Sequence, residues 1–109
     1  MTRTKFPRDE NGEALRSMEE SGDDLSKSRV IDFSVVFEDV ENARAFRDQI
    51  QNPETKVVID DDTSERVDVT VSREMTPTHD AISDFEMMLE RIASPLGGRN
   101  DGWGCFAVK

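Results

Sequence analysis

One histidine and one cysteine are the side chains best suited to acid–base or nucleophilic chemistry in this sequence of 109 residues. A histidine-dependent scheme must use His79, and a cysteine nucleophile must be Cys105. His79 falls in the first turn of a predicted helix, where the positive end of the helix dipole disfavours a protonated imidazole. The spacing does not bring the two side chains together. We therefore expect a solvent-exposed His79 and no catalytic residues, and an enzyme built on this pair is the least favoured hypothesis.

Three consecutive aspartates, Asp60, Asp61 and Asp62, superficially resemble the start of a calcium loop. Such a loop needs glycine at its sixth position and a bidentate glutamate at its twelfth, and these positions hold Glu65 and Val71. We therefore predict no metal site. The aspartates are either a soluble turn at a hairpin tip or a contact for a basic partner.

The only tryptophan, Trp103, stands between Gly102 and Gly104 at the start of the last apolar segment. Glycines permit special dihedral angles or close backbone approach, and a large aromatic ring needs a defined pocket. Trp103 is then either a structural plug that fixes the final strand or a partner anchor, since tryptophan is enriched at interface hot spots. The preceding pair, Gly97 and Gly98, lacks the lysine and hydroxyl of a phosphate-binding loop, so we predict no cofactor.

The charge of the sequence excludes some classes of partner. Lys and Arg total 14 against 24 Asp and Glu, and residues 1–29 hold seven acids and six bases. Residues 30–109 therefore carry nearly all of the net charge of −10. Nucleic-acid binders need a cationic surface to replace counterions, so we expect no direct contact with DNA or RNA and a protein partner with a basic surface.

Cysteine content and hydropathy predict the compartment. One cysteine forms no intramolecular disulfide, which fits a reducing environment. No stretch approaches the ~18 apolar residues of a membrane span. We expect a cytoplasmic protein.

The elements that position these residues follow from hydrophobic periodicity. Residues 1–29 form a polar segment in which two turn-rich patches, 9–12 and 21–24, bracket one short amphipathic helix that ends at Gly22. The alternation of apolar and polar residues from Val30 predicts a strand. Asp39 is expected to cap a helix over 40–50. The β-branched runs at 56–60 and 66–72 predict a hairpin. Thr76 and Pro77 open a second helix that ends near Pro95, and residues 103–108 form the fourth strand.

The resulting order, β-α-β-β-α-β, predicts an α+β, ferredoxin-like domain over residues 30–109. In it two helices cover one face of a four-stranded antiparallel sheet. RNA-recognition domains use the same order, but they stack bases on aromatics of their central strands, and residues 66–72 contain no aromatic. The other sheet face is partly polar, and the N-terminal segment can lie across it.

The motif Asp101-Gly102-Trp103-Gly104 resembles the RraB family, named for regulators that inhibit the endoribonuclease E of bacteria. The glycine pair at 97–98 and the strand at 31–37 also match, and residues 6–12 and 22–25 are similar to a common subgroup. The resemblance implies a ferredoxin-like fold and a small bacterial cytoplasmic regulator that binds the ribonuclease and lowers its activity without touching RNA. The alternative is a small-molecule-binding or other protein-interaction module of the same fold, with its pocket near Trp103 and the glycine pair.

Overall fold

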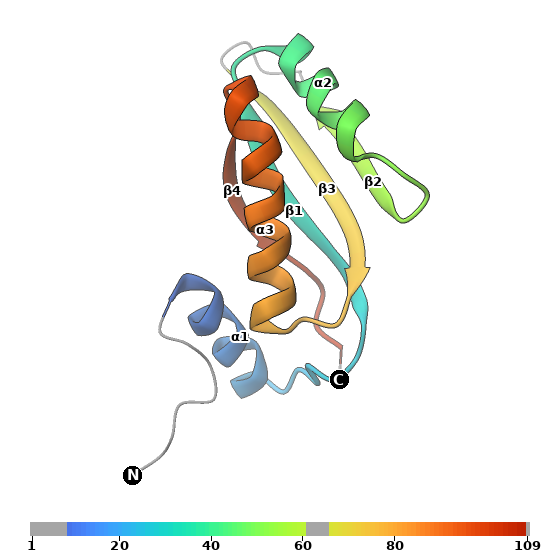
Figure 1. The fold of residues 1–109 in the computed structure, drawn as a ribbon. Helices are drawn as coiled ribbons and strands as arrows, with labels where there is room; N and C mark the ends of the chain where they lie inside the picture. The colour runs from blue at the N-terminus through green and yellow to red at the C-terminus, as the bar shows by residue number, and fades with distance from the viewer. Residues whose placement is uncertain (1–8, 61–65, 109) are drawn as a thin grey trace.

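The computed structural model describes residues 9–60 and 66–108 (Figure 1). Within these residues the chain forms three α-helices, one short 3-10 helix and four strands. In chain order they are α1 (Glu10–Glu20), β1 (Arg29–Phe37), α2 (Val40–Ile50), β2 (Thr55–Asp60), β3 (Val67–Met75), α3 (His79–Ala93), η1 (Ser94–Leu96) and β4 (Arg99–Gly104).

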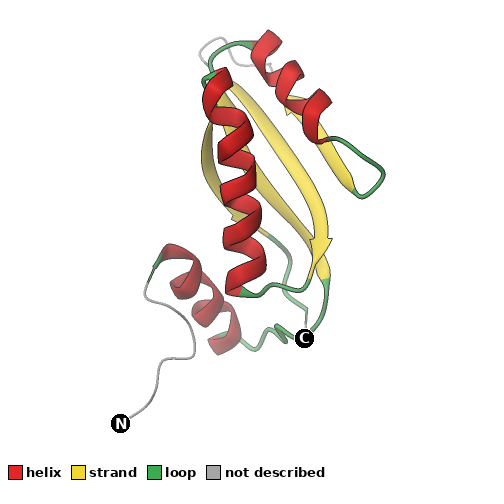
Figure 2. Ribbon diagram, viewed as in Figure 1, coloured by secondary structure: helices red, strands yellow, loops and turns green. Residues whose placement is uncertain are grey.

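The four strands form one sheet in the order β2-β3-β1-β4, and each neighbouring pair is antiparallel. Helices α2 and α3 lie on the same face of this sheet (Figure 2). The predicted α+β class and the four-stranded antiparallel sheet are therefore confirmed, and so is the hairpin of β2 and β3.

The core lies between the sheet and helices α2 and α3. Alternate residues of β1 point into it, because side chains along a strand alternate between the two faces. Phe33 packs on Phe85 of α3 with ring centroids 4.7 Å apart, and Phe37 packs on Phe46 of α2 at 5.1 Å. Leu15 of α1 is also fully buried and belongs to the same core cluster. The first helix is thus part of the folded body.

Helix α1 begins earlier than the sequence analysis predicted, because the patch at 9–12 is not a turn. Asp9 is the N-cap, and its side chain accepts a hydrogen bond of 2.8 Å from the backbone N–H of Gly12. The predicted end is confirmed. Gly22 adopts φ of 96°, and its N–H and that of Asp23 bond to Glu19 and Met18, which closes the helix in a Schellman motif.

Helix α3 begins two residues later than expected, and the prediction that Thr76 and Pro77 open it was wrong. Thr78 is the N-cap, since its hydroxyl accepts a hydrogen bond from the N–H of Ala81 at 3.1 Å. Pro77 is buried ahead of the helix. A residue that precedes proline is disfavoured in the helical conformation, so the helix does not include Thr76.

The last strand is also shifted: it was expected at 103–108 and lies at Arg99–Gly104. Asn100 pairs with Val35 and Trp103 with Phe33, so β4 carries one extra residue at this point, a β-bulge. Gly102 supplies the positive φ of 95° there. The bulge interrupts the alternation, and β4 is an edge strand with a largely exposed sequence, so the apolar segment after it was mistaken for the strand.

The N-terminal helix contacts α3 and does not cross the sheet face opposite α2 and α3, contrary to the arrangement considered from the sequence. Figure 1 shows α1 beside the N-terminal end of α3, away from α2. Across residues 9–60 and 66–108, no helix combines the length and apolar character that crossing a bilayer requires.

Candidate partner-binding surface

The sheet face opposite α2 and α3 presents mostly polar side chains to solvent. Alternation assigns it every second residue of β1, β2 and β3. These positions are Val30, Asp32, Ser34, Val36, Lys56, Val58, Asp60, Asp68, Thr70, Ser72 and Glu74. We call this set the open face. All of its members except Val36 are exposed or partly exposed, whereas the alternate positions in the same strands are mostly buried.

Strand register arranges the open face in rows. Asp32, Ser72 and Lys56 lie opposite one another on three adjacent strands, and the Ser72 hydroxyl donates a hydrogen bond of 2.6 Å to Asp32. In the next row, Val58 pairs with Thr70, which pairs with Ser34. The polar groups therefore form a regular, flat array whose geometry is set by backbone pairing.

The charge of the open face is predominantly negative. Asp32, Asp60, Asp68 and Glu74 face solvent there, against Lys56 within the set and the exposed Arg99 of the edge strand β4, which pairs with Val36. Asp60 pairs directly with Asp68, an arrangement that costs stability when both carboxylates are ionised. Arg66 lies 3.1 Å from Asp68 in an ion pair and partly offsets this repulsion. The array suits a partner that presents cationic groups.

The aspartate run falls partly on this face. Asp60 is the exposed last residue of β2. Asp61 and Asp62 lie outside the residues that the structure describes, so their contact with a basic partner stays a prediction.

Trp103 is partly buried against the core, as a plug of the final strand should be. Its indole N–H donates a hydrogen bond of 2.8 Å to the side-chain oxygen of Asn11 in α1. The amide nitrogen of Asn11 donates in turn to Ser83 at 3.1 Å and to Glu86 at 2.7 Å, both in α3. Trp103 therefore joins β4, α1 and α3. These contacts account for a structural role, and its role as a partner anchor stays a prediction.

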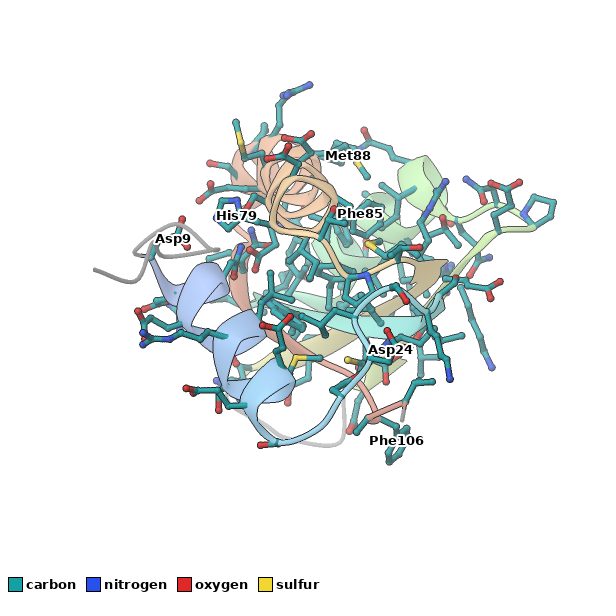
Figure 3. All side chains as sticks on the ribbon, turned by 90° about the horizontal axis from the view of Figure 1, so that it is seen from below. Asp9, Asp24, His79, Phe85, Met88 and Phe106 are labelled. Atoms are coloured by element: carbon teal, nitrogen blue, oxygen red, sulfur yellow. The ribbon has the colours of Figure 1, made fainter. Side chains whose placement is uncertain are left out.

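His79 is not the exposed histidine that was expected. Its side chain is only 20% exposed, and its Nε2 lies 2.8 and 3.1 Å from the two carboxylate oxygens of Asp9 (Figure 3). The Gly12 N–H, together with His79, lowers the pKa of Asp9. Asp9 and Asn11 were not predicted as site residues; the signal for Asp9 was an N-cap residue type followed by the acidic first-turn residues Glu10 and Glu13.

The structure separates His79 from Cys105. His79 bonds to the N-cap of α1, while Cys105 lines a hollow of about 160 Å³ with Met18 and Ser21 at the other end of that helix. A helix rises 1.5 Å per residue, so the two ends of α1 are roughly 15 Å apart. The only pair that the sequence offered for nucleophilic catalysis is not assembled. In the described part of the chain, no group of three His, Cys, Asp or Glu residues is placed to hold a metal ion.

Of the glycine pair at 97–98, Gly98 packs against the core while Gly97 is exposed. Gly97 ends η1 with φ of 80°, and a methyl group on Gly98 would lie 2.4 Å from the Phe37 ring. Phe37 thus fills the space over Gly98 where the alternative hypothesis placed a ligand pocket.

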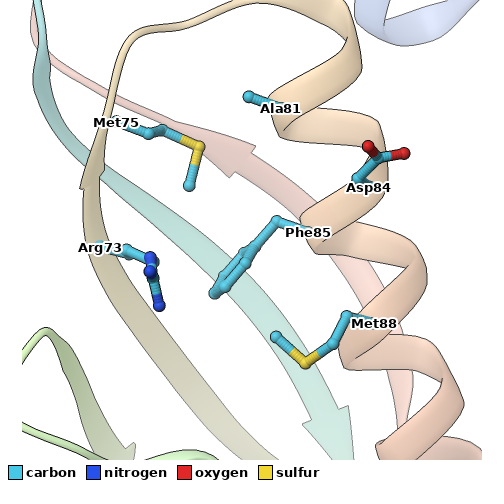
Figure 4. A pocket seen from close by; sticks show the side chains of 6 residues that line it. All are labelled: Arg73, Met75, Ala81, Asp84, Phe85 and Met88. Atoms are coloured by element: carbon cyan, nitrogen blue, oxygen red, sulfur yellow. The ribbon is translucent and has the colours of Figure 1, made fainter.

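A different hollow, of about 380 Å³, opens between β3 and α3 (Figure 4). Phe85 and Met88 reach into it from α3, and Arg73 and Met75 from β3. The Arg73 guanidinium lies 5.7 Å from the centre of the Phe85 ring, a cation–π contact. Its side chain also donates a hydrogen bond of 3.0 Å to Thr55. This hollow was not predicted from the sequence.

The sequence model of the RraB family, regulator of ribonuclease activity B, matches residues 8–105. No curated protein matches the chain. The matched span includes Asn11 and the motif Asp101-Gly102-Trp103-Gly104, which the hydrogen bond of Trp103 brings together.

Proposed function

The chain belongs to the RraB family of regulators of ribonuclease activity, and on that premise we propose that it is a non-catalytic inhibitor that binds an RNase E-type endoribonuclease. We infer that it acts in the bacterial cytoplasm, where its lone cysteine stays reduced. We also propose a ferredoxin-like fold, supported by the β-α-β-β-α-β order of β1 to β4.

The observation that carries this proposal is the acidic open face. A ribonuclease holds RNA with cationic surfaces, because binding the phosphate backbone requires Lys and Arg. A flat array with Asp32, Asp68 and Glu74 is complementary to such a surface. The regulator would bind where RNA binds, or bind beside it and stabilise a less active state, and in either case lower the rate of cleavage.

Titration calorimetry with the ribonuclease of the host organism, at low and at high salt, tests the proposal. We expect binding at low salt that weakens as salt rises, together with slower cleavage of an RNA substrate. No binding at low salt would overturn the proposal. Binding that leaves the cleavage rate unchanged would overturn the inhibitory role.

Neutral substitutions on the open face test where the partner binds. The triple variant Asp32→Asn, Asp68→Asn and Glu74→Gln should lower the association rate roughly tenfold, since steering by charge acts mainly on this rate. The matched control removes three exposed acids from the helices: Glu41→Gln, Asp48→Asn and Glu90→Gln. The control has the same net charge, so equal effects of the two triples would show that only total charge matters and would exclude the open face as the binding surface.

The hollow between β3 and α3 supports a second candidate function, the binding of a small molecule. Phe85, Met75 and Met88 supply apolar walls, and Arg73 and Asp84 supply one charge of each sign. A thermal-shift screen of small apolar carboxylates would test it. A stabilising ligand whose effect disappears in Phe85→Leu would support this function, and a screen without any stabilising compound would count against it.

A further inference from the structure

Phe106 is the most exposed large apolar side chain in the described part of the chain. It is 91% exposed, compared with 60% for Met87, 55% for Val30 and 49% for Val58. Figure 3 shows its ring pointing away from the body, on the opposite side of the sheet from α3. A phenylalanine ring in water gains nothing for folding, because it buries almost no apolar area.

The backbone on both sides of Phe106 is nevertheless held in place. The N–H of Asp24 donates a hydrogen bond of 2.6 Å to the carbonyl of Val108, and the N–H of Val108 donates to the carboxylate of Asp23 at 3.3 Å. The carbonyl of Phe106 itself accepts a hydrogen bond of 3.4 Å from Arg29. The exposed ring therefore belongs to a segment whose backbone is fixed by hydrogen bonds.

A buried ion pair between Asp23 and Arg29 supports these hydrogen bonds to the C-terminal segment. The Arg29 guanidinium is 2.7 Å from the Asp23 carboxylate, and the two side chains are only 5% and 2% exposed. Arg29 also donates to the carbonyls of Asp24 and Lys27. Removing charges from water is costly unless they are paired and fully hydrogen-bonded, as these are. The pair holds the 23–29 loop and the C-terminal segment against each other.

Phe106 follows the edge strand that borders the open face. Asp32 of β1 pairs with Gly104, the last residue of β4, and Phe106 lies two residues beyond it in the chain. Val30 is half exposed and pairs with Glu74 on β3. Phe106 therefore lies near the end of the open face that contains Val30 and Glu74, since its carbonyl accepts a hydrogen bond from Arg29, the neighbour of Val30.

We propose that Phe106 is the anchor of the partner interface, inserting into an apolar hollow that lysines or arginines border on the ribonuclease. The inference rests on the proposed function and adds the contact that holds the complex together. Aromatic anchors surrounded by polar groups supply most of the free energy of many interfaces. Because the segment is already fixed, little conformational entropy remains to be lost on binding. The acids of the open face match the cationic border.

Phe106→Ala tests the inference, with Met87→Ala as the matched control on the helix side. We expect Phe106→Ala to weaken binding to the ribonuclease roughly tenfold or more, mainly through faster dissociation. Both variants should keep the melting temperature, because neither ring nor thioether is buried. Phe106→Trp should retain binding, since it keeps a large aromatic ring at this position.

The outcomes separate this inference from the proposed function. If the unaltered protein does not bind the ribonuclease, the proposed function fails and the inference fails with it. If it binds, and Phe106→Ala binds equally well, the function stands and the anchor is overturned. The inference is also wrong if analytical ultracentrifugation shows a dimer that Phe106→Ala dissociates. The partner of Phe106 would then be a second copy of this chain and not the ribonuclease.

Discussion

Trp103 and Asn11 are 92 positions apart in the sequence and meet through one hydrogen bond of 2.8 Å. Each belongs to a segment that the sequence analysis singled out: the motif at 101–104 and the patch at 9–12. Asn11 uses its other polar atom to bond Ser83 and Glu86. At the scale of single residues, the family motif therefore has a structural explanation, because it attaches the first helix to the sheet and to α3.

Substitutions at Trp103 test this role. Trp103→Ala should lower the free energy of unfolding by ~3–5 kcal/mol, because packing of the ring is lost and a cavity forms. Trp103→Phe should cost ~1–3 kcal/mol, since the oxygen of Asn11 loses its donor. Urea denaturation measures both. If Trp103→Ala leaves stability unchanged while binding of the ribonuclease falls, Trp103 is a partner anchor and the structural role is wrong.

At the scale of elements, the middle of the chain was the most predictable part. Helix α2 has the cap at Asp39 and the bounds that periodicity predicted, and β1 has the predicted alternation. The starts of α3 and β4 were misplaced. In both cases a competing local signal was stronger in the sequence: a Thr-Pro pair before α3, and an apolar run after β4. The cap that Thr78 forms and the bulge at Gly102 decided the actual bounds.

Gly98, which precedes β4, and Gly104, which ends it, provide a matched pair for testing how this element packs. Gly98→Ala should destabilise the protein by ~1–3 kcal/mol, because the added methyl group would lie 2.4 Å from the Phe37 ring. Gly104→Ala should change stability by less than ~0.5 kcal/mol, since no atom lies within 4 Å of its added methyl group. Thermal unfolding compares them. Equal effects would mean that the contact with Phe37 does not limit residue 98.

At the scale of the whole molecule, carboxylates attach the N-terminal part of the chain to the rest. Asp9 bonds to His79 at one end of α1, and Asp23 pairs with Arg29 beyond the other end. Between these attachments, Leu15 is fully buried in the common core. The boundary at residues 29 and 30, which separates a polar segment from a domain, stays a prediction.

These attachments make stability depend on acid pH. Arg29 lowers the pKa of Asp23, and the Gly12 N–H with His79 lowers that of Asp9. Each contribution is present above the pKa of an unfolded aspartate, about 3.9, and is lost as the pH falls through the lower value of the folded state. We expect the free energy of unfolding to decrease below about pH 4, and amide exchange in α1 to increase first.

Urea denaturation at a series of pH values checks this expectation, with Asp23→Asn as the comparison. The variant should be less stable at pH 7, because Arg29 then keeps a buried charge without its ionic partner. Its stability should change less below about pH 4. If the variant shows the same acid dependence as the unaltered protein, the pair of Asp23 and Arg29 is not responsible.

The sequence by itself determined the features that depend on neighbouring residues: the alternation of β1, the cap and stripe of α2, the hairpin, the acidic charge and the family motif. Only the tertiary structure decided which of them meet. It paired Asn11 with Trp103 and Asp9 with His79, kept His79 away from Cys105, and left Phe106 exposed beside the open face. The physical reason is that periodicity and capping act over a few residues, whereas these contacts depend on strand register and on one bulge, which no local pattern specifies.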